Sequence, residues 1–102
     1  MKNKTTIDKD ATPWEIKRQK LTGIQYSYSM NGKRLVTEAH YKDGVLHGYE
    51  ILYGENKGHI LCKTPYKNGI RHGIELQPTL GVKTHWENGT IIKVDLEESP
   101  AG

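Results

Sequence analysis

The sequence contains a single cysteine, no phenylalanine and no long run of apolar residues. Cys62 alone cannot form an intramolecular disulfide or a cysteine-rich zinc site, which favours a reducing compartment. No segment approaches the roughly 18 apolar residues of a membrane-spanning helix, and Met1–Thr6 is not followed by the apolar segment of a secretory signal. We therefore expect a cytoplasmic protein that does not span a membrane.

Aliphatic residues are also scarce. Leu, Ile and Val together number 21 of 102 residues, close to the roughly 20% level below which chains tend to be disordered. The net charge of only +3 opposes disorder, because little repulsion has to be overcome. Glycine, with 11 residues, and tyrosine, with six, are abundant instead. This composition predicts one domain built as a thin, tyrosine-faced sheet rather than around a thick core.

The positive charge is diluted along the chain. Residues 1–23 and 24–93 each carry a net +3, from six bases against three acids and from nine bases against six, and residues 94–102 carry −3. Nucleic-acid binding usually needs Lys and Arg gathered on one face, and the densest group here is Lys17–Lys20. Neither a nucleic acid nor a membrane is therefore the expected partner.

A short helix is predicted near the N-terminus. Thr12 can cap the helix N-terminus, Pro13 suits the first turn, and Glu15 can complete a capping box with Thr12. We expect the helix to run from residue 13 to 21, to be closed by Gly23, and to cap the structure that follows.

From residue 24 onward, apolar residues recur at every second position, which is typical of strands. Turn signals separate these alternating segments, and tight turns join antiparallel neighbours. The predicted fold is all-β: an elongated, single-layer antiparallel meander of about seven or eight strands. The turn signals are Asn31-Gly32, Asp43-Gly44, 54–58, Asn68-Gly69, 78–81 and Asn88-Gly89.

Two eight-residue segments, Tyr41–Gly48 and Tyr66–Gly73, match almost position for position at a separation of 25 residues. Segment 86–92 is a degenerate third copy without the closing His-Gly, and segment 28–33 is a weaker fourth. Repetition at this period predicts a stacked array, because one hairpin cannot bury its own face.

The shared pattern, aromatic-x-Asn/Asp-Gly-x-x-His-Gly, resembles the MORN repeat, and in particular the bacterial MORN variant found in antitoxin components. The resemblance covers residues 28–95. It implies β-hairpin repeats that form an elongated, twisted single sheet, and a small inhibitor from a bacterium or a phage. The expected organisation is a flexible lead at 1–11, a capping helix at 12–23, a MORN-like repeat domain at 24–96 and a tail at 97–102.

Metal binding and catalysis are not expected. His47 and His72 occupy equivalent repeat positions, so the repeat itself explains them, and His40 and His85 form a second matching pair. A metal site of Cys62 with His59 and another histidine would need its ligands to converge. Cys62 lies within a strand pattern, where a free cysteine is usually a small buried hydrophobe. No P-loop, nucleophile elbow or paired carboxylates are present, so we expect neither an enzyme nor a cofactor.

The leading prediction is a protein-binding module that occludes a partner, a toxin or a defence enzyme. Tyr and Trp supply much of the energy of protein interfaces and keep a polar tip. A single sheet leaves such rings half exposed, although cross-strand packing explains some of them equally well. The predicted binding residues are Tyr26, Tyr28, Tyr41, Tyr49, Tyr53, Tyr66 and Trp86, with Arg34, Lys42, Lys67 and Arg71 as rim charges.

Two alternatives stay open. An open array has two sheet edges, so copies of the chain can pair edge to edge and build a homo-oligomer or scaffold. The basic segment 17–20 and the repeat lysines can instead bind a nucleic acid or an anionic surface weakly.

Overall fold

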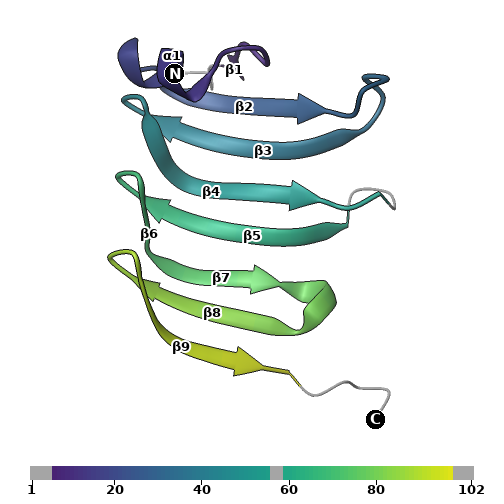
Figure 1. Cartoon of the computed structure of the whole chain (residues 1–102), viewed down its shortest axis with the longest axis vertical. Coiled ribbons are helices and arrows are strands. Elements are labelled where there is room, and N and C mark those ends of the chain that lie inside the picture. The colour runs from purple at the N-terminus through teal and green to yellow at the C-terminus, as the bar shows by residue number, and fades with distance from the viewer. Residues whose placement is uncertain (1–5, 56–58, 98–102) are drawn as a thin grey trace, which may run out of the picture.

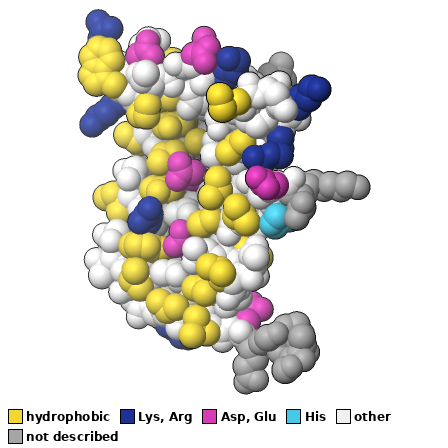
Figure 2. Space-filling view, turned by 45° about the vertical axis from the view of Figure 1, so that its right-hand side comes forward, with side chains coloured by type: hydrophobic (Ala, Val, Ile, Leu, Met, Phe, Trp, Pro, Cys, Tyr) yellow, Lys and Arg dark blue, Asp and Glu magenta, His cyan; other side chains and the backbone are white. Residues whose placement is uncertain are grey.

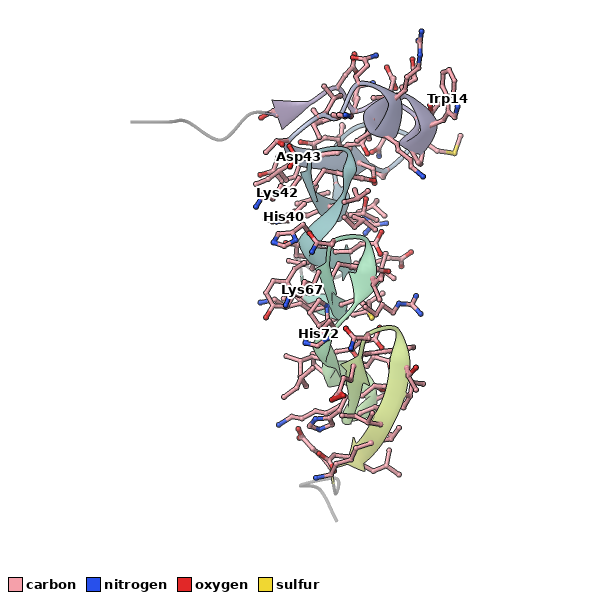
Figure 3. The ribbon with its side chains drawn as sticks, turned by 90° about the vertical axis from the view of Figure 1, so that its left-hand side faces the viewer. Trp14, His40, Lys42, Asp43, Lys67 and His72 are labelled. Carbon is pink, nitrogen blue, oxygen red and sulfur yellow. The ribbon has the colours of Figure 1, made fainter. Side chains whose placement is uncertain are left out.

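The computed structural model of the protein describes residues 6–55 and 59–97. These residues form one open, mixed sheet of nine strands and one short α-helix (Figure 1). Seen edge-on, the sheet is a single layer with side chains on both sides (Figure 3). The elements are β1 (Thr6–Ile7), α1 (Pro13–Arg18), β2 (Gly23–Tyr28), β3 (Leu35–Lys42), β4 (Val45–Tyr53), β5 (Ile60–Lys67), β6 (Ile70–Arg71), β7 (Gly73–Gln77), a 3₁₀ turn (Pro78–Leu80), β8 (Val82–Glu87) and β9 (Thr90–Leu96).

The predicted β-rich single sheet is confirmed, with one change of topology. The strands follow the order β1-β2-β3-β4-β5-β7-β8-β9, with β6 paired to β5 beside this path. All neighbours from β2 to β9 are antiparallel, as tight turns require. β1 runs parallel to β2, however, so the sheet is mixed rather than purely antiparallel.

Residues 6–11, which belong to the predicted lead, contain the short strand β1, and specific contacts join this segment to the sheet. Ile7 is only 3% exposed. The side-chain amide of Gln25, on β2, donates hydrogen bonds to the carbonyls of Asp8 and Ala11, each at 2.8 Å. These long-range contacts join the lead to the sheet, and a local reading of a polar segment cannot anticipate them. Residues 1–5 lie outside the described residues.

Helix α1 begins as predicted and ends early. The Thr12 side chain accepts from the Glu15 N–H at 3.1 Å, and the Glu15 carboxylate accepts from the Thr12 N–H at 2.8 Å, which completes the capping box. The helix ends at Arg18, because Lys20 adopts a positive φ of 51° and turns the chain. Gly23 therefore does not close the helix; it is the first residue of β2.

Three turns at the same end of the strands, which follow β3, β5 and β8, contact the preceding repeat in the same way. The N–H groups of Gly44, Gly69 and Gly89 donate to backbone carbonyls about one repeat earlier, those of Leu21, Leu46 and Arg71, at 2.9, 2.7 and 2.8 Å. Each turn therefore rests on the strand pair before it, and the repeats are joined by backbone hydrogen bonds beyond those of the sheet itself.

The residue before each of these glycines makes a second contact. The N–H groups of Asn68 and Asn88 donate to Nδ1 of His47 and His72, both at 3.1 Å. The N–H of Asp43 donates to the Thr22 hydroxyl at 2.9 Å. The repeat histidines thus accept hydrogen bonds from the next turn, as the structural explanation predicts, and Thr22 replaces histidine in the first unit.

These contacts correct the predicted fourth copy. The Asn31-Gly32 turn joins β2 to β3 at the opposite end of the strands (Figure 1), so segment 28–33 is not equivalent to the other copies. The first unit contains Leu21-Thr22-Gly23 instead, and Gly23, Gly48 and Gly73 recur at intervals of 25 residues.

Cross-strand pairing divides the side chains between two faces, because directly opposite residues share a face. The Trp86 face carries Gln25, Ala39, Tyr41, Glu50, Thr64, Tyr66, Glu75, Thr84 and Trp86, and the Tyr49 face carries Ile24, Tyr26, Glu38, His40, Tyr49, Ile51, Lys63, Leu76 and His85.

The core is thin, as the composition predicts. Among the described residues, the buried aliphatic side chains are Ile7, Ile16, Ile24, Ala39 and Ile51, all in the N-terminal half, and Pro65 of β5 is buried as well. The protein is therefore best packed where α1 and β1 cover the sheet and progressively more exposed towards β9. Of the predicted tail, Glu97 alone is described, and its N–H donates to the Gly81 carbonyl at 2.7 Å.

Candidate functional site on the Trp86 face

The structure divides the predicted binding residues between the two faces. Tyr41, Tyr66, Trp86 and Arg71 lie on the Trp86 face. Tyr26, Tyr49 and Tyr53 lie on the Tyr49 face, and Tyr28 follows a register shift in β2. Lys42 and Lys67 lie beside the turns, on the same side of the sheet as His40 (Figure 3). The Arg34 side chain donates to the Gly54 carbonyl at 3.1 Å.

A single binding face that carries every tyrosine is therefore not formed. Successive residues of a strand point to opposite faces. Tyr66 lies opposite Gly48, whereas Tyr49 lies one residue further along β4, opposite Pro65, and points to the other side. Arg34 contacts backbone instead of forming part of a rim.

Each aromatic residue of the Trp86 face lies opposite a repeat glycine. The pairs are Tyr41 with Gly23, Tyr66 with Gly48, and Trp86 with Gly73. Glycine has no side chain to pack, so a ring on the neighbouring strand can cover its backbone, an arrangement known to stabilise sheets. The three rings form a row along one face, each opposite a glycine.

Glu75 is the centre of a hydrogen-bond cluster on this face. Its Oε2 accepts from the Thr64 hydroxyl at 2.7 Å and from the Cys62 thiol at 3.3 Å, and its Oε1 accepts from the Trp86 indole at 3.0 Å. Burial by itself would raise the pKa of Glu75, but these hydrogen bonds and the charge of Arg71 lower the pKa below its usual value. Glu75 is therefore an ionised side chain that fixes the orientation of the Trp86 ring.

Arg71 lies between two of the aromatic rings. Its Nε donates to the Tyr66 hydroxyl at 3.3 Å, and its guanidinium carbon is 4.9 Å from the centroid of Trp86 and 6.0 Å from that of Tyr66. Tyr66 in turn donates to Glu50 at 3.5 Å. These contacts hold an exposed cation in place without covering it.

A shallow hollow of about 310 Å³ adjoins this cluster. Figure 2 shows groups of hydrophobic side chains over the sheet, with separate acidic and basic side chains among them. The hollow is lined by Thr37, Glu50, Leu52, Cys62, Thr64, Arg71 and Glu75.

The cluster lacks the properties of a nucleophilic or metal site. Burial, followed by the hydrogen bond to Glu75, raises the pKa of the Cys62 thiol, so Cys62 is protonated near neutral pH. His59 is not part of the hollow and lies against Gly54. Within residues 6–55 and 59–97, no group of three or more His, Cys, Asp or Glu side chains is placed to hold a metal ion.

The Tyr49 face has a different character, because its histidine side chains contact acidic side chains. His40 contacts Glu38 at 2.7 Å, and Tyr53 donates to the same carboxylate at 2.9 Å. His85 contacts Asp95 at 2.9 Å. Lys63 lies over the Tyr49 ring at 4.3 Å from its centroid, which makes this pair a natural counterpart to Arg71 and Trp86.

Glu50, Thr64 and Glu75 are site residues that the sequence prediction missed. A signal for two of them was present, since Gln25, Glu50 and Glu75 each follow a repeat glycine by two residues and recur at intervals of 25. All three lie on the Trp86 face. Thr64 has no such signal, because its role depends on the register of β5 against the neighbouring strands.

No protein-family model matches the sequence, and comparison with curated proteins and with solved structures finds no match either. The likeness to MORN repeats accordingly stays a prediction. In the described part of the chain, no helix has the length and apolarity that crossing a bilayer requires.

The lowered pKa of Glu75 predicts a loss of stability in acid. A group whose pKa is depressed by folding contributes stability above its unfolded pKa, and this contribution disappears as the pH falls through the folded value. We expect the urea midpoint of the wild type to fall between pH 6 and pH 3 more steeply than that of Glu75→Gln, together with a change in Trp86 fluorescence in a Trp14→Phe background. Equal pH dependence of the two proteins would contradict the assignment.

Proposed function

We propose that this protein is a non-enzymatic binding module whose Trp86 face covers a functional surface of a partner protein. The observation that carries the proposal is the position of Arg71, held between Tyr66 and Trp86 on a sheet face that no other described element covers at this point. Trp, Tyr and Arg are the residues that most often dominate the energy of protein interfaces.

The cluster is also organised before any partner binds. Glu75 fixes the indole of Trp86, and Tyr66 holds the guanidinium of Arg71. Side chains that are already ordered lose less conformational entropy on binding, so more of the contact energy contributes to affinity. A rigid sheet presents the row of rings in one arrangement, which suits the recognition of a preformed surface.

The class of partner follows from the resemblance to antitoxin-type MORN proteins. We propose a small inhibitor that binds a toxin or a defence enzyme and blocks access to its active site. In this proposal, Tyr41, Tyr66, Arg71 and Trp86 form the contact surface, and the tyrosines of the opposite face have structural roles.

Charge reversal on each face tests the proposal. The tagged protein is used to capture a partner from the bacterial or infected host, and the affinity for the purified partner is then measured. We expect Arg71→Glu to weaken binding by roughly 30-fold or more, the range of an interface hot spot. Lys63→Glu, which alters the equivalent cation over Tyr49, is expected to change affinity by less than about threefold, since exposed charges away from an interface contribute little.

The partner must also lose its activity when the wild type binds. A captured protein whose enzymatic activity is unchanged in the complex would contradict inhibition by occlusion. An effect of Lys63→Glu as large as that of Arg71→Glu would contradict the choice of face.

A further inference from the structure

The two ends of the sheet differ. At the N-terminal end, β1 is two residues long and α1 lies over the neighbouring turn, where a Cβ on Gly44 would meet the Lys17 backbone at 2.9 Å. At the other end, β9 is seven residues long and, among the described residues, pairs only with β8. Its apolar side chains are half or more exposed: Ile91 51%, Ile92 59%, Val94 51% and Leu96 74%.

An edge of this kind is a template for another strand, since one row of its backbone N–H and C=O groups has no strand partner. Stacked repeat arrays normally place a polar terminal unit over such an end. The edge strand at the N-terminal end, β1, is only two residues long, whereas β9 is both apolar and long enough to pair. The residues of β9 then indicate which partner strand is most complementary to β9.

We propose that β9 pairs antiparallel with β9 of a second copy of this chain, about a two-fold axis at Val94. In this register each Lys93 lies opposite Asp95 of the second copy, so two oppositely charged pairs form. Ile92 lies opposite Leu96 of the second copy, and the two Val94 side chains meet at the axis. Within residues 92–96, apolar residues therefore face apolar residues and each charge faces its opposite, while Ile91 lies opposite Glu97, the residue after β9.

Neighbouring registers lack this complementarity. An axis at Lys93 places the two Lys93 side chains opposite each other and Asp95 opposite Ile91. An axis at Asp95 brings the two carboxylates together at its centre, although it places Lys93 opposite Glu97. Axes between residues would place side chains of different faces opposite each other, which an antiparallel pair does not allow. Because like charges directly opposite each other are unfavourable, and a charge gains nothing from an apolar neighbour, the axis at Val94 is favoured.

The charged groups around this edge are compatible with the pairing. Lys93 and Asp95 already lie 3.6 Å apart within one chain, and His85 contacts Asp95 at 2.9 Å. Lys83 contacts Glu97 at 3.7 Å. The chain therefore places Lys93 and Asp95 side by side on one face, where the same two residues of a second copy, running in the opposite direction, match them in reverse order.

Pairing in this register continues the sheet from one copy into the next with the same face outward. Val94 and Leu96 lie opposite Thr84 and Val82 of β8, so they belong to the Trp86 face. In the dimer these side chains form one apolar strip across the junction, with an Arg71 cluster on either side. The dimer is independent of the proposed partner, and the Arg71→Glu variant is expected to remain dimeric.

Charge exchange at positions 93 and 95 tests the register. By size-exclusion chromatography with light scattering, over a series of concentrations, the wild type is expected to reach twice the chain mass of 11.6 kDa. Lys93→Asp places acidic residues opposite each other twice, and Asp95→Lys does the same with bases. Each variant alone is expected to dimerise roughly tenfold more weakly or not at all, whereas an equimolar mixture restores both charge pairs and forms a heterodimer.

Each contrary result overturns a stated part of the proposal. A wild type that is monomeric at every concentration removes the dimer. An Asp95→Lys protein that dimerises as well as the wild type removes the register, and so does a mixture that fails to associate although both chains are folded by circular dichroism.

A second pair of variants avoids the charged cluster. Leu96 is 74% exposed and Leu80, which lies in the 3₁₀ turn between β7 and β8 and not in β9 itself, is 69% exposed, so lysine is tolerated at either position in the monomer. Leu96→Lys is expected to lose the dimer and Leu80→Lys to keep it. Equal behaviour of the two variants would contradict pairing through β9.

Discussion

Replacing Ile16 with alanine is expected to destabilise the protein by about 3 kcal/mol, within the roughly 2–5 kcal/mol found for large-to-small changes at fully buried sites. Ile16 is 0% exposed, the most deeply buried of the large side chains in the described residues. The substitution removes apolar contact and leaves a cavity between α1 and the end of the sheet. Since small domains are stable by only about 5–15 kcal/mol, this is a large fraction of the total.

The matched control is Ile74→Ala on β7, where the same side chain is 48% exposed. We expect this control to lose less than about 1 kcal/mol, because an exposed isoleucine gives up little burial. Free energies of unfolding are measured in urea. The two tryptophans report on different ends of the sheet, Trp14 in α1 and Trp86 in β8, so single-tryptophan variants follow each end.

In Ile16→Ala, the urea midpoint of the transition that Trp14 reports is expected to fall at least as far as the midpoint that Trp86 reports. A similar loss for Ile16→Ala and Ile74→Ala would show that α1 contributes little to the stability of the sheet, and the capping role of this helix would then be wrong.

The sequence predicts the sheet well because the signals for it are local. Alternating apolar residues define most of the strands, and Asn-Gly or Asp-Gly marks most of the turns. The start of α1 was likewise predictable, since Thr12, Pro13 and Glu15 act within one helical turn. The end of α1 was not, because Lys20 adopts a positive φ that its residue type does not signal. The existence of β1 was not, because it depends on pairing with β2, which is distant in the sequence.

The candidate site was predictable in part. Arg71, Tyr66 and Trp86 were named from residue type alone, and the structure brings them together. The division of the tyrosines between faces depends on where each strand's alternation starts, and a shift of one residue moves a side chain to the opposite face. Glu75 was missed because an acidic residue in an alternating strand is usually solvated. Its recurrence with Gln25 and Glu50 marks a repeat position, but only the register of the strands places it beside Thr64 and Trp86.

A single-layer sheet lets the same residues serve the fold and the proposed binding. Tyr41, Tyr66 and Trp86 each lie opposite a glycine of the neighbouring strand, in a sheet without a second layer of strands. Rings in such a sheet can contact their cross-strand neighbours and still keep an accessible side. This is the physical basis for proposing that a folded, stable array also serves as a contact surface.

Replacing Gly44 with alanine is expected to cost about 3 kcal/mol, the largest effect among the turn glycines, since two separate penalties add. Gly44 has a φ of +87°, which an L-residue adopts at a cost of about 1–2 kcal/mol. A Cβ there would also lie 2.9 Å from both Cα and O of Lys17 and 3.0 Å from the Ile16 carbonyl. These are backbone atoms, so α1 itself has to move away from the turn.

Three other turn glycines separate strain from collision. Gly32, at φ +73°, has no atom within 4 Å of the added Cβ, so Gly32→Ala measures strain alone. A Cβ on Gly69 would meet Val45 Cβ at an ordinary 3.5 Å, and one on Gly89 would meet the end of the Ile70 side chain at 3.2 Å. A side-chain methyl can shift by a few tenths of an ångström, whereas a capped helix cannot shift without losing its contacts.

The expected order of destabilisation is therefore Gly44→Ala well above Gly89→Ala, with Gly69→Ala and Gly32→Ala lowest, measured as free energies of unfolding in urea. Gly44→Ala should also expose Ile16, so the losses in free energy of unfolding caused by Gly44→Ala and Ile16→Ala should not add in the double variant. A Gly44→Ala loss equal to that of Gly32→Ala would mean that α1 is free to move, and additive effects of Gly44→Ala and Ile16→Ala would lead to the same conclusion. A strongly sub-additive double variant, by contrast, is the result expected if α1 and the Gly44 turn form one packed cap on an otherwise open sheet.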